Sequence, residues 1–553
     1  MAAQELFTFL VGGQAGQGVK SAAAGASAIL AGLGRETFQT DDYQSLIRGG
    51  HNFSAVSSRP GPVSGRYRKA DLIVALDARS YEEHRDELTD GGVLVRNSDE
   101  VEEGEGIGAP ITSLAEDYPR PLLRSGVAAV AVLCSALGMD EDALAETIER
   151  IYTKDSENNV AFAKAVYGSV NEDLGGRFEL EGDGKKRTLL AGSEAICLGA
   201  AAAGLDVYIA YPMTPASPLL HFLSKRDEEL SVVTLHPESE IAVANMALGC
   251  AMTGARAMVG TSGGGFALMA EAFSLAGMSE SPCLIFLGQR PGPATGVPTY
   301  TEQGDLRFAL NAGHGEFARI VASPGSVAES FLLAAELLDL SWRFQSPAVL
   351  LTDKHLSECT ATADIDLDSA AWAEPVMHEG GDYRRYADTE NGVSPLLFPP
   401  SAEMIKWTSY EHDELGVTTE EADMTARMHD KRQRKAEALE EHLKSVRTVN
   451  RVGEKGPVVF TYGSSAMAVH EAARSGGLDL RIVQPIYLEP FPIWELEEFR
   501  GEDVVVVEAS AAGQFARLLR EKIGVKTSSI VRRYDGRPFE PTELAEELEK
   551  ATS

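Results

Sequence analysis

The sequence predicts an α/β protein with three α/β domains, and three observations lead to this class. Short apolar runs rich in strand-forming residues alternate with longer helical patterns, an arrangement typical of parallel sheets with helices on both faces. This alternation is interrupted twice, by a charged glycine-containing stretch and by a long polar segment. Finally, a chain of 553 residues is too long for one hydrophobic core, because a domain takes about 150 residues.

The first domain is expected over residues 1–180. It opens with an apolar run at 6–11, a glycine-rich loop at 12–18 and a helical pattern that continues to about residue 34. A strand, a glycine turn and a helix in this order begin a βαβ unit. The loop does not have the G-x-G-x-x-G spacing, so by itself it fits a tight turn as well as a nucleotide site. Further along, the pattern predicts strands at 70–76 and 92–95, a helix at 79–88 and a buried helix at 126–137.

The second domain is expected over residues 188–360, after a charged linker at 181–187. Ligands of open parallel sheets bind beyond the carboxyl ends of the strands, so a site is expected where the strands of this domain end. The pattern predicts strands at 206–210, 232–235, 257–260 and 283–287, helices at 192–204 and 238–253, and a further helix after 261–265.

Residues suited to ligand binding follow these strands. A turn stiffened by two prolines holds Thr214, and Glu238 and Glu240 begin the helix after the next strand. The glycines at 263–265 allow a backbone to approach a ligand and offer amide donors at a helix start. Arg290 follows another strand, in a loop of glycine and proline. Each feature has an ordinary structural explanation, such as helix capping for the glutamates, but their gathering in one domain favours a binding site.

The rest of the chain divides into a connection and a third domain. Residues 361–450 are expected to form an extended connection with a charge-rich helix at 419–446, and the charges favour a solvated or inter-subunit surface for this helix. Residues 451–553 are expected to return to α/β structure. The pattern there predicts strands at 457–462, 480–484 and 504–508 and helices at 465–475 and 513–522.

The composition disfavours several classes of function. The chain has 50 basic and 83 acidic side chains and a net charge of −33, whereas binding to nucleic acid needs an excess of Lys and Arg. Its five cysteines are scattered without a C-x-x-C pair, so neither a disulfide framework nor a metal site on this chain is predicted. The N-terminus does not resemble a signal peptide, and no apolar run approaches the about 20 residues of a membrane span. The chain is therefore expected to be cytoplasmic, without a membrane partner.

Four segments of the second domain together resemble the α subunit of 2-oxoacid:ferredoxin oxidoreductases. They are AYPMTPAS at 210–217, HPESEI at 236–241, GTSGGG at 260–265 and QRPG at 289–292. The form that is resembled, of the 2-oxoglutarate synthase type, has a γ domain fused at its N-terminus, and the match covers nearly the whole chain. Many members have Ile and Ser where this chain has Met213 and Ala216, a departure that bears on the choice of substrate. Further matches are SLIRGGH at 45–51, GVSP at 392–395, EHDE at 411–414, YGSS at 462–465 and Glu508.

The resemblance implies more about the fold and the cofactors. The second domain would be the pyrimidine-type domain of a thiamin enzyme, a doubly wound parallel sheet, and the third would be similar to the C-terminal domain of transketolase. The thiamin diphosphate site would be shared with a β subunit that carries Mg²⁺ and a [4Fe-4S] cluster. Coenzyme A would be a co-substrate on the side of the γ domain, and ferredoxin would take the electrons. The chain would be active only with its β subunit, in a heterodimer or heterotetramer.

The resemblance also implies roles for individual residues. Glu240 would hydrogen-bond N1′ of the pyrimidine ring and so favour the tautomer that removes the thiazolium C2 proton, with Glu238 as the rival. Thr214 and Arg290 would hold the carboxylate of the 2-oxo acid, because a guanidinium suits a bidentate carboxylate contact; Tyr211 is expected beside them. The expected cofactor contacts are Thr261, Ser262 and Gly263, and the expected coenzyme A contacts are Gly13, Gln14, Gly16 and Arg48.

The implied reaction reversibly converts a 2-oxo acid, coenzyme A and oxidised ferredoxin into acyl-coenzyme A, carbon dioxide and reduced ferredoxin. The γ–α fusion favours 2-oxoglutarate as substrate over pyruvate or a broad range of 2-oxo acids. Two other functions stay open. A thiamin-dependent non-oxidative decarboxylase or transketolase relative would need a complete diphosphate site, yet no G-D-G followed by Asn at that spacing is visible. In a non-catalytic scaffold or ligand-binding subunit, replacement of Glu240 would leave turnover intact.

Overall fold

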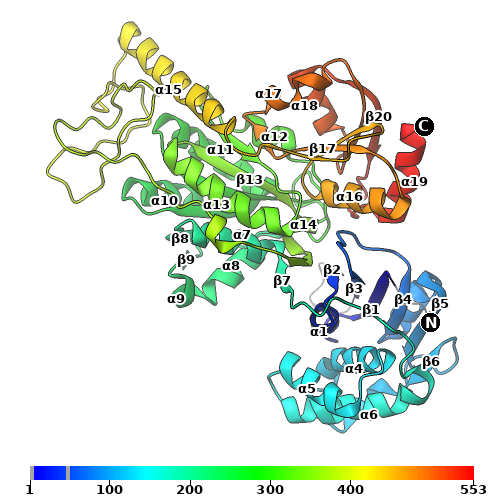
Figure 1. Ribbon diagram of the computed structural model, residues 1–553. Helices are drawn as coiled ribbons and strands as arrows, with labels where there is room; N and C mark the ends of the chain where they lie inside the picture. The colour runs from blue at the N-terminus through cyan, green and yellow to red at the C-terminus, as the bar shows by residue number, and fades with distance from the viewer. Residues whose placement is uncertain (1–4, 45–49) are drawn as a thin grey trace. The chain divides into compact units, whose positions relative to one another are not determined.

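The computed structural model describes residues 5–44 and 50–553, which form two compact units (Figure 1). The first unit takes the residues up to Leu190 together with Cys359–Asp364 and Glu540–Glu543, and the second takes the others. Both units contain sheets flanked by helices, which confirms the predicted α/β class. Within the described ranges, no helix has both the length and the apolar character that crossing a bilayer requires.

The first unit is built on a sheet with the strand order β6-β5-β4-β1-β3-β2-β14-β7. Its strand β1 (Phe7–Gln14) is parallel to β4 (Ala70–Ala75) and antiparallel to β3 (His51–Arg59). The predicted strands at 6–11 and 70–76 are thus direct neighbours. Because β2 (Glu36–Asp42) is also antiparallel to β3, β3 lies between β1 and β2, which are parallel to each other. The sheet is completed by β5 (Leu88–Asn97), β6 (Ile107–Ala109), β7 (Thr188–Ala191) and β14 (Thr360–Ala363).

Alanine-rich helices supply the core of the first unit. Helix α1 (Val19–Gly32) packs against α4 (Pro121–Ala136), which is buried from residue 124 to its end and confirms the predicted buried helix. Helices α5 (Glu141–Ile151) and α6 (Ser156–Leu174) lie beside α4 in Figure 1. Shorter elements follow β4 and β6, namely α2 (Ala78–His84), η1 (Arg85–Glu87) and α3 (Ile111–Glu116).

The second unit contains a sheet with the order β18-β12-β13-β11-β10-β8-β9. Its parallel strands are β8 (Val207–Ala210), β9 (Val233–Leu235), β10 (Ala257–Ser262), β11 (Cys283–Gln289), β12 (Ile320–Ala322) and β13 (Pro347–Asp353). Alternate residues of these strands point to opposite faces of the sheet and belong to two different hydrophobic cores. On one face, Tyr208 packs with α7 (Gly192–Ala202) and α13 (Val327–Arg343). Its neighbour Ile209 belongs to the core that includes α10 (Glu240–Met252) and α11 (Gly263–Met278). Helices therefore cover both faces, and the prediction of a doubly wound sheet is confirmed.

Short helices connect the strands of this sheet. They are α8 (Ser217–Ser224), α9 (Asp227–Leu230), α12 (Leu306–Asn311) and α14 (Lys354–Glu358). The loop that leads from β11 to α12 contacts the carboxyl ends of neighbouring strands, through Arg290 and Thr301.

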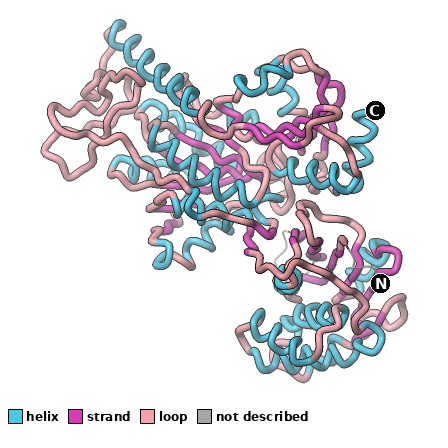
Figure 2. Tube along the Cα trace, viewed as in Figure 1, coloured by secondary structure: helices cyan, strands magenta, loops and turns pink. Residues whose placement is uncertain are grey.

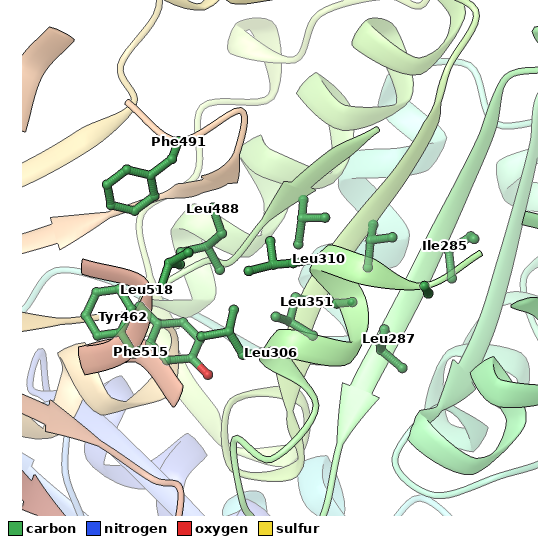
Figure 3. Packing of buried hydrophobic residues seen from close by; sticks show 14 of the residues in the cluster. Ile285, Leu287, Leu306, Leu310, Leu351, Tyr462, Leu488, Phe491, Phe515 and Leu518 are labelled. Atoms are coloured by element: carbon green, nitrogen blue, oxygen red, sulfur yellow. The ribbon is translucent and has the colours of Figure 1, made fainter. Parts of the chain in front are cut away.

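The end of the chain adds a second sheet to the same unit, in the order β15-β17-β16-β19-β20. Its apolar residues and those of the doubly wound sheet form one cluster. Figure 3 shows Leu306 and Leu310 of α12 between Leu351 of β13 and Phe515 of α18 (Gln514–Ile523). The strand β18 (Tyr487–Glu489) also pairs with β12. The remaining strands are β15 (Val449–Val452), β16 (Val458–Thr461), β17 (Arg481–Pro485), β19 (Asp503–Glu508) and β20 (Lys526–Arg532), and the helices are α16 (Ser464–Gly476), α17 (Ile493–Leu496), η3 (Glu497–Phe499), α18 (Gln514–Ile523) and α19 (Pro541–Thr552).

The connection before β15 runs mostly as loop through residues 364–421 and then forms α15 (Ala422–Leu443), as Figure 2 shows. Within this loop, η2 (Leu367–Ser369) is a single short turn. Lys431 and Lys435 of α15 are buried, and each donates to the carboxylate of Glu280 at 2.7 Å. The expectation of a merely solvated or inter-subunit helix was therefore wrong for this face, because paired charges hold it against the unit.

Candidate functional site

The carboxyl ends of four parallel strands lie side by side in the second unit. Ala210 of β8 is in register with Gly260 of β10, Ser262 of β10 with Gly288 of β11, and Gln289 of β11 with Asp353 of β13. The turn that follows β8, the start of α11, and Arg290 therefore lie along one edge of the sheet. This is the edge where ligands of open parallel sheets bind.

Glu240 is buried at the start of α10. Ser239 caps the helix by accepting from the backbone N–H of Ala242, so the carboxylate of Glu240 is not needed as a cap. Glu240 is 4% exposed, whereas the rival Glu238 is exposed. Among the described residues, Oε1 of Glu240 has no hydrogen-bond partner. Leaving a buried acceptor without a donor costs about 1–3 kcal/mol, and more for a charged group, so this oxygen is suited to a donor from a ligand.

The first turn of α11 is shaped to receive this carboxylate. A methyl group on Gly265 would lie 2.6 Å from Oε1 of Glu240 and 2.1 Å from Oγ1 of Thr261. Only glycine leaves room for both side chains at this turn. The structure thus brings together Glu240, Thr261 and the glycine-rich start of α11, all of which are predicted site residues.

Arg290 contacts the turn after β8. Its Nη1 donates to the backbone carbonyl of Thr214 at 2.9 Å, and burial lowers its pKa against the opposing charge of Asp305. Ser262 faces the sulfur of Met213, with 2.7 Å between Oγ and Sδ. Tyr211 is exposed, and its ring centroid lies 6.0 Å from that of His236. Arg290 and Thr214 therefore meet as predicted by the strand-end argument, and the other N–H groups of the guanidinium have no described partner.

Asp305 is a site residue that the sequence did not single out. It lies just before α12, and its backbone N–H donates to Oε1 of Gln289 at 3.0 Å. Its carboxyl group covers Gly263, where a methyl group would lie 2.4 Å from Oδ2. Burial raises the pKa of Asp305 to about 6, against the attraction of Arg290. A carboxyl group thus stands beside the predicted substrate-binding arginine.

Asp353 anchors the loop that carries Asp305. It is buried at the end of β13 and accepts from Thr301 at 3.2 Å, from Gln303 at 3.3 Å and from Ser464 of α16. Oε1 of Gln303 in turn accepts from the backbone N–H of Ala509 at 3.0 Å. These bonds fix the loop between the two sheets of the second unit. The strand-end rule applies to Asp353, but β13 is absent from the predicted strands.

The residues predicted to contact coenzyme A belong to the first unit. Gly13 and Gln14 are part of β1, which extends further than the predicted strand, and a methyl group on Gly13 would lie 2.5 Å from Oε1 of Gln17. Gly13 is therefore packed against the side chain of Gln17. Gly16 is exposed with a φ of +100°, and Gly18 begins α1 with a φ of 76°. Arg48 lies outside the described residues.

Comparisons with known proteins agree on one family. Residues 198–434 match the family described as pyruvate flavodoxin/ferredoxin oxidoreductase, thiamine diphosphate-binding, and residues 8–169 match pyruvate ferredoxin/flavodoxin oxidoreductase. The chain is 28% identical to the 2-oxoacid:ferredoxin oxidoreductase subunit alpha of a Sulfolobus species, over 98% of this chain and 96% of the relative. It is 28% identical to the 2-oxoglutarate synthase subunit KorA of Archaeoglobus fulgidus, over 65% of this chain and 98% of the relative.

A solved structure is similar over its whole length. The 2-oxoglutarate:ferredoxin oxidoreductase from Magnetococcus marinus, with 2-oxoglutarate, coenzyme A and succinyl-CoA bound, superposes with a TM-score of 0.90 and 26% identity, covering 100% of both chains.

Proposed function

Since the chain belongs to the family of 2-oxoacid:ferredoxin oxidoreductase α subunits, we propose that it supplies one half of a thiamin diphosphate and 2-oxo acid site and is active with a β subunit. The observation that carries this proposal is the buried carboxylate of Glu240, whose Oε1 has no partner among the described residues. A protonated ring nitrogen is a suitable donor for such an oxygen. The unpartnered acceptor, which Gly265 allows to lie against the first turn of α11, fits the pyrimidine ring of this cofactor.

Three features of this chain would hold the cofactor. Glu240 would hold a proton at N1′ of the pyrimidine, Thr261 and Ser262 line the end of β10, and Gly263 begins the first turn of α11. When bound, thiamin diphosphate would supply a nucleophilic carbon and an electron sink for the decarboxylation of a 2-oxo acid. Glu240 is favoured over Glu238 because a carboxylate excluded from water makes the stronger hydrogen bond.

Arg290 and Thr214 would orient the substrate. The bond from Arg290 to the carbonyl of Thr214 fixes one edge of the guanidinium, which leaves the other edge for a carboxylate in a bidentate contact. Tyr211, exposed beside them, would line the entrance. We favour 2-oxoglutarate over pyruvate, in line with the names of the relative from Archaeoglobus fulgidus and of the Magnetococcus marinus structure.

The remaining parts of the reaction would lie on other groups. A β subunit would provide Mg²⁺ for the diphosphate and a [4Fe-4S] cluster that passes electrons to ferredoxin. Coenzyme A would be the acyl acceptor, in line with the coenzyme A in the Magnetococcus marinus structure. The turn from Gln14 to Gly18, with its exposed Gly16, together with Gly13 and Arg48, is our candidate for its binding on the first unit.

The proposal is tested on the enzyme purified with its native partner chains. Glu240→Gln should lower 2-oxo acid-dependent reduction of ferredoxin about 10²- to 10⁴-fold, the usual share of acid–base catalysis, and thiamin diphosphate retention is measured alongside. Glu238→Gln is the matched control, because the exposed Glu238 lies two residues before Glu240, outside α10; it should keep full turnover. A panel with 2-oxoglutarate and pyruvate fixes the substrate. Full turnover by Glu240→Gln would favour a non-catalytic subunit instead.

A further inference from the structure

The carboxyl group of Asp305 lies at the start of α11. Its oxygens lie over Gly263, the first residue of this helix, and Ser262 provides no side-chain cap there. The N-terminal turn of a helix attracts anions through its free N–H groups and its dipole. Oε1 of Glu240 lies against the same turn at Gly265 and has no hydrogen-bond partner among the described residues. A buried acceptor without a donor indicates that a ligand binds at this turn.

The charges around Asp305 are unevenly distributed. Arg290, after β11, attracts its carboxylate, while Glu302 on the same loop and Tyr462 after β16 are the other titratable groups that face it. Glu240 lies at the same helix turn. Arg290 is therefore the cation that acts on Asp305 before a substrate has entered.

We propose that Asp305 is a positioning residue that competes with the substrate's carboxylate for Arg290 and the first turn of α11, so that the 2-oxo acid binds together with one proton taken up by Asp305 from solvent. This inference rests on the proposed function. The substrate brings a second carboxylate to a guanidinium that already attracts the charge of Asp305. Two carboxylates that share one cation repel each other, and the repulsion is removed when one of them is protonated.

The direction of the pH dependence follows from the raised pKa of Asp305, about 6. Below this pH Asp305 is neutral, Arg290 is unbalanced, and the ionised substrate binds most tightly. Above it, binding must include the uptake of a proton, so KM should rise with pH by up to about tenfold per unit. Turnover at saturating substrate should change little, because the substrate-bound enzyme already carries the proton.

The test compares wild type, Asp305→Asn and Glu336→Gln in the complete enzyme, with 2-oxoglutarate and pyruvate as substrates and methyl viologen as acceptor from pH 5.5 to 8.5. Asp305→Asn removes the charge with little change of shape, so its KM should be flat with pH and, at pH 8, at least tenfold below that of wild type. Glu336 is a matched control, since burial raises its pKa to about 7 on α13, away from Arg290. Glu336→Gln should keep the pH slope of wild type.

Two results would overturn the inference: the same pH slope of KM in wild type and Asp305→Asn, or a loss in kcat with KM unchanged. Thermal unfolding of each variant shows whether its fold is intact, and Asp305→Glu, which keeps the titrating group, should restore a pH slope. If the wild-type enzyme turns over neither 2-oxo acid, the proposed function itself fails. If it turns over one of them without this pH effect, only the role of Asp305 fails.

Discussion

At the scale of single residues, Gly265 decides where the carboxylate of Glu240 lies. A methyl group there would lie 2.1 Å from Oγ1 of Thr261 and 2.6 Å from Oε1 of Glu240, so Gly265→Ala must displace at least one of them. Because a displacement of about 1 Å can cost about 10²-fold in rate, turnover should fall at least about tenfold. Overpacking should also destabilise the fold by about 1–3 kcal/mol. Steady-state turnover and thermal unfolding measure the two effects.

Gly168→Ala is the control for this substitution. Gly168 is also helical, on α6, and no atom lies within 4 Å of the position that its methyl group would take. Alanine there should leave turnover unchanged and raise stability by about 0.5–1 kcal/mol. Equal turnover in the two variants would show that Gly265 does not constrain Glu240.

Part of the site could be predicted from single residues. Thr214, Glu240 and Arg290 directly follow predicted strands, so the rule that ligands bind at strand ends identifies them. No local pattern marks Asp305, because its position over Gly263 arises from the path of the loop after β11. The choice between Glu238 and Glu240 depends on burial, which two glutamates at one helix start do not reveal.

At the scale of elements, α15 is held by a buried ion cluster. Burial by itself raises the pKa of Glu280, but the charges of Lys431 and Lys435 outweigh it and hold that pKa below its ordinary value. Glu280→Gln would leave two buried ammonium groups without a counter-charge, so the free energy of unfolding should fall by about 3–5 kcal/mol. Denaturant titration measures it. The contribution of Glu280 is present at neutral pH and is lost as pH falls below about 4.3.

Glu441→Gln is the matched control on the same helix. Glu441 forms an ion pair with Lys444 at 2.7 Å, but both side chains are exposed, and such pairs contribute at most about 1 kcal/mol. The wild-type protein and Glu441→Gln should lose stability in acid in the same way, while Glu280→Gln should lose less. An equal loss in all three would mean that Glu280 is not paired in solution.

Among the strands that the sequence did not predict, β2 and β3 have polar side chains in their buried parts. β2 and β3 are rich in Ser, Thr, Gln and Asp, and their side chains bond to each other, as Ser54 does with Asp41 at 2.7 Å and Ser27 of α1 with Gln39 at 2.9 Å. Alternation of apolar residues is therefore absent where the sheet is nonetheless buried. In the doubly wound sheet β8, β9, β10 and β11 could be predicted from their apolar runs, whereas β13 was missed although it is equally apolar.

At the scale of the whole molecule, the second unit is larger than either of the α/β domains predicted within it. The sheet that carries the candidate site and the C-terminal sheet share one apolar cluster. The loop from Thr301 to Asp305 is bonded to both, through Asp353 on one side and Ala509 on the other. The position of Asp305, and with it the charge around Arg290, therefore depends on the C-terminal part of the chain. Sequence periodicity describes each sheet separately and does not reveal this shared core.

Phe515→Ala tests this dependence. Phe515 of α18 is fully buried, and its ring centroid lies 4.9 Å from that of Tyr462. Removing such a ring should cost about 3–5 kcal/mol. Because the core is shared, amide hydrogen exchange should accelerate in β11 and β13 of the doubly wound sheet as well as in β19 of the C-terminal sheet. Val452→Ala, at an exposed position of β15, should change neither. Faster exchange confined to β16, β17 and β19 would show that the two sheets are stabilised separately.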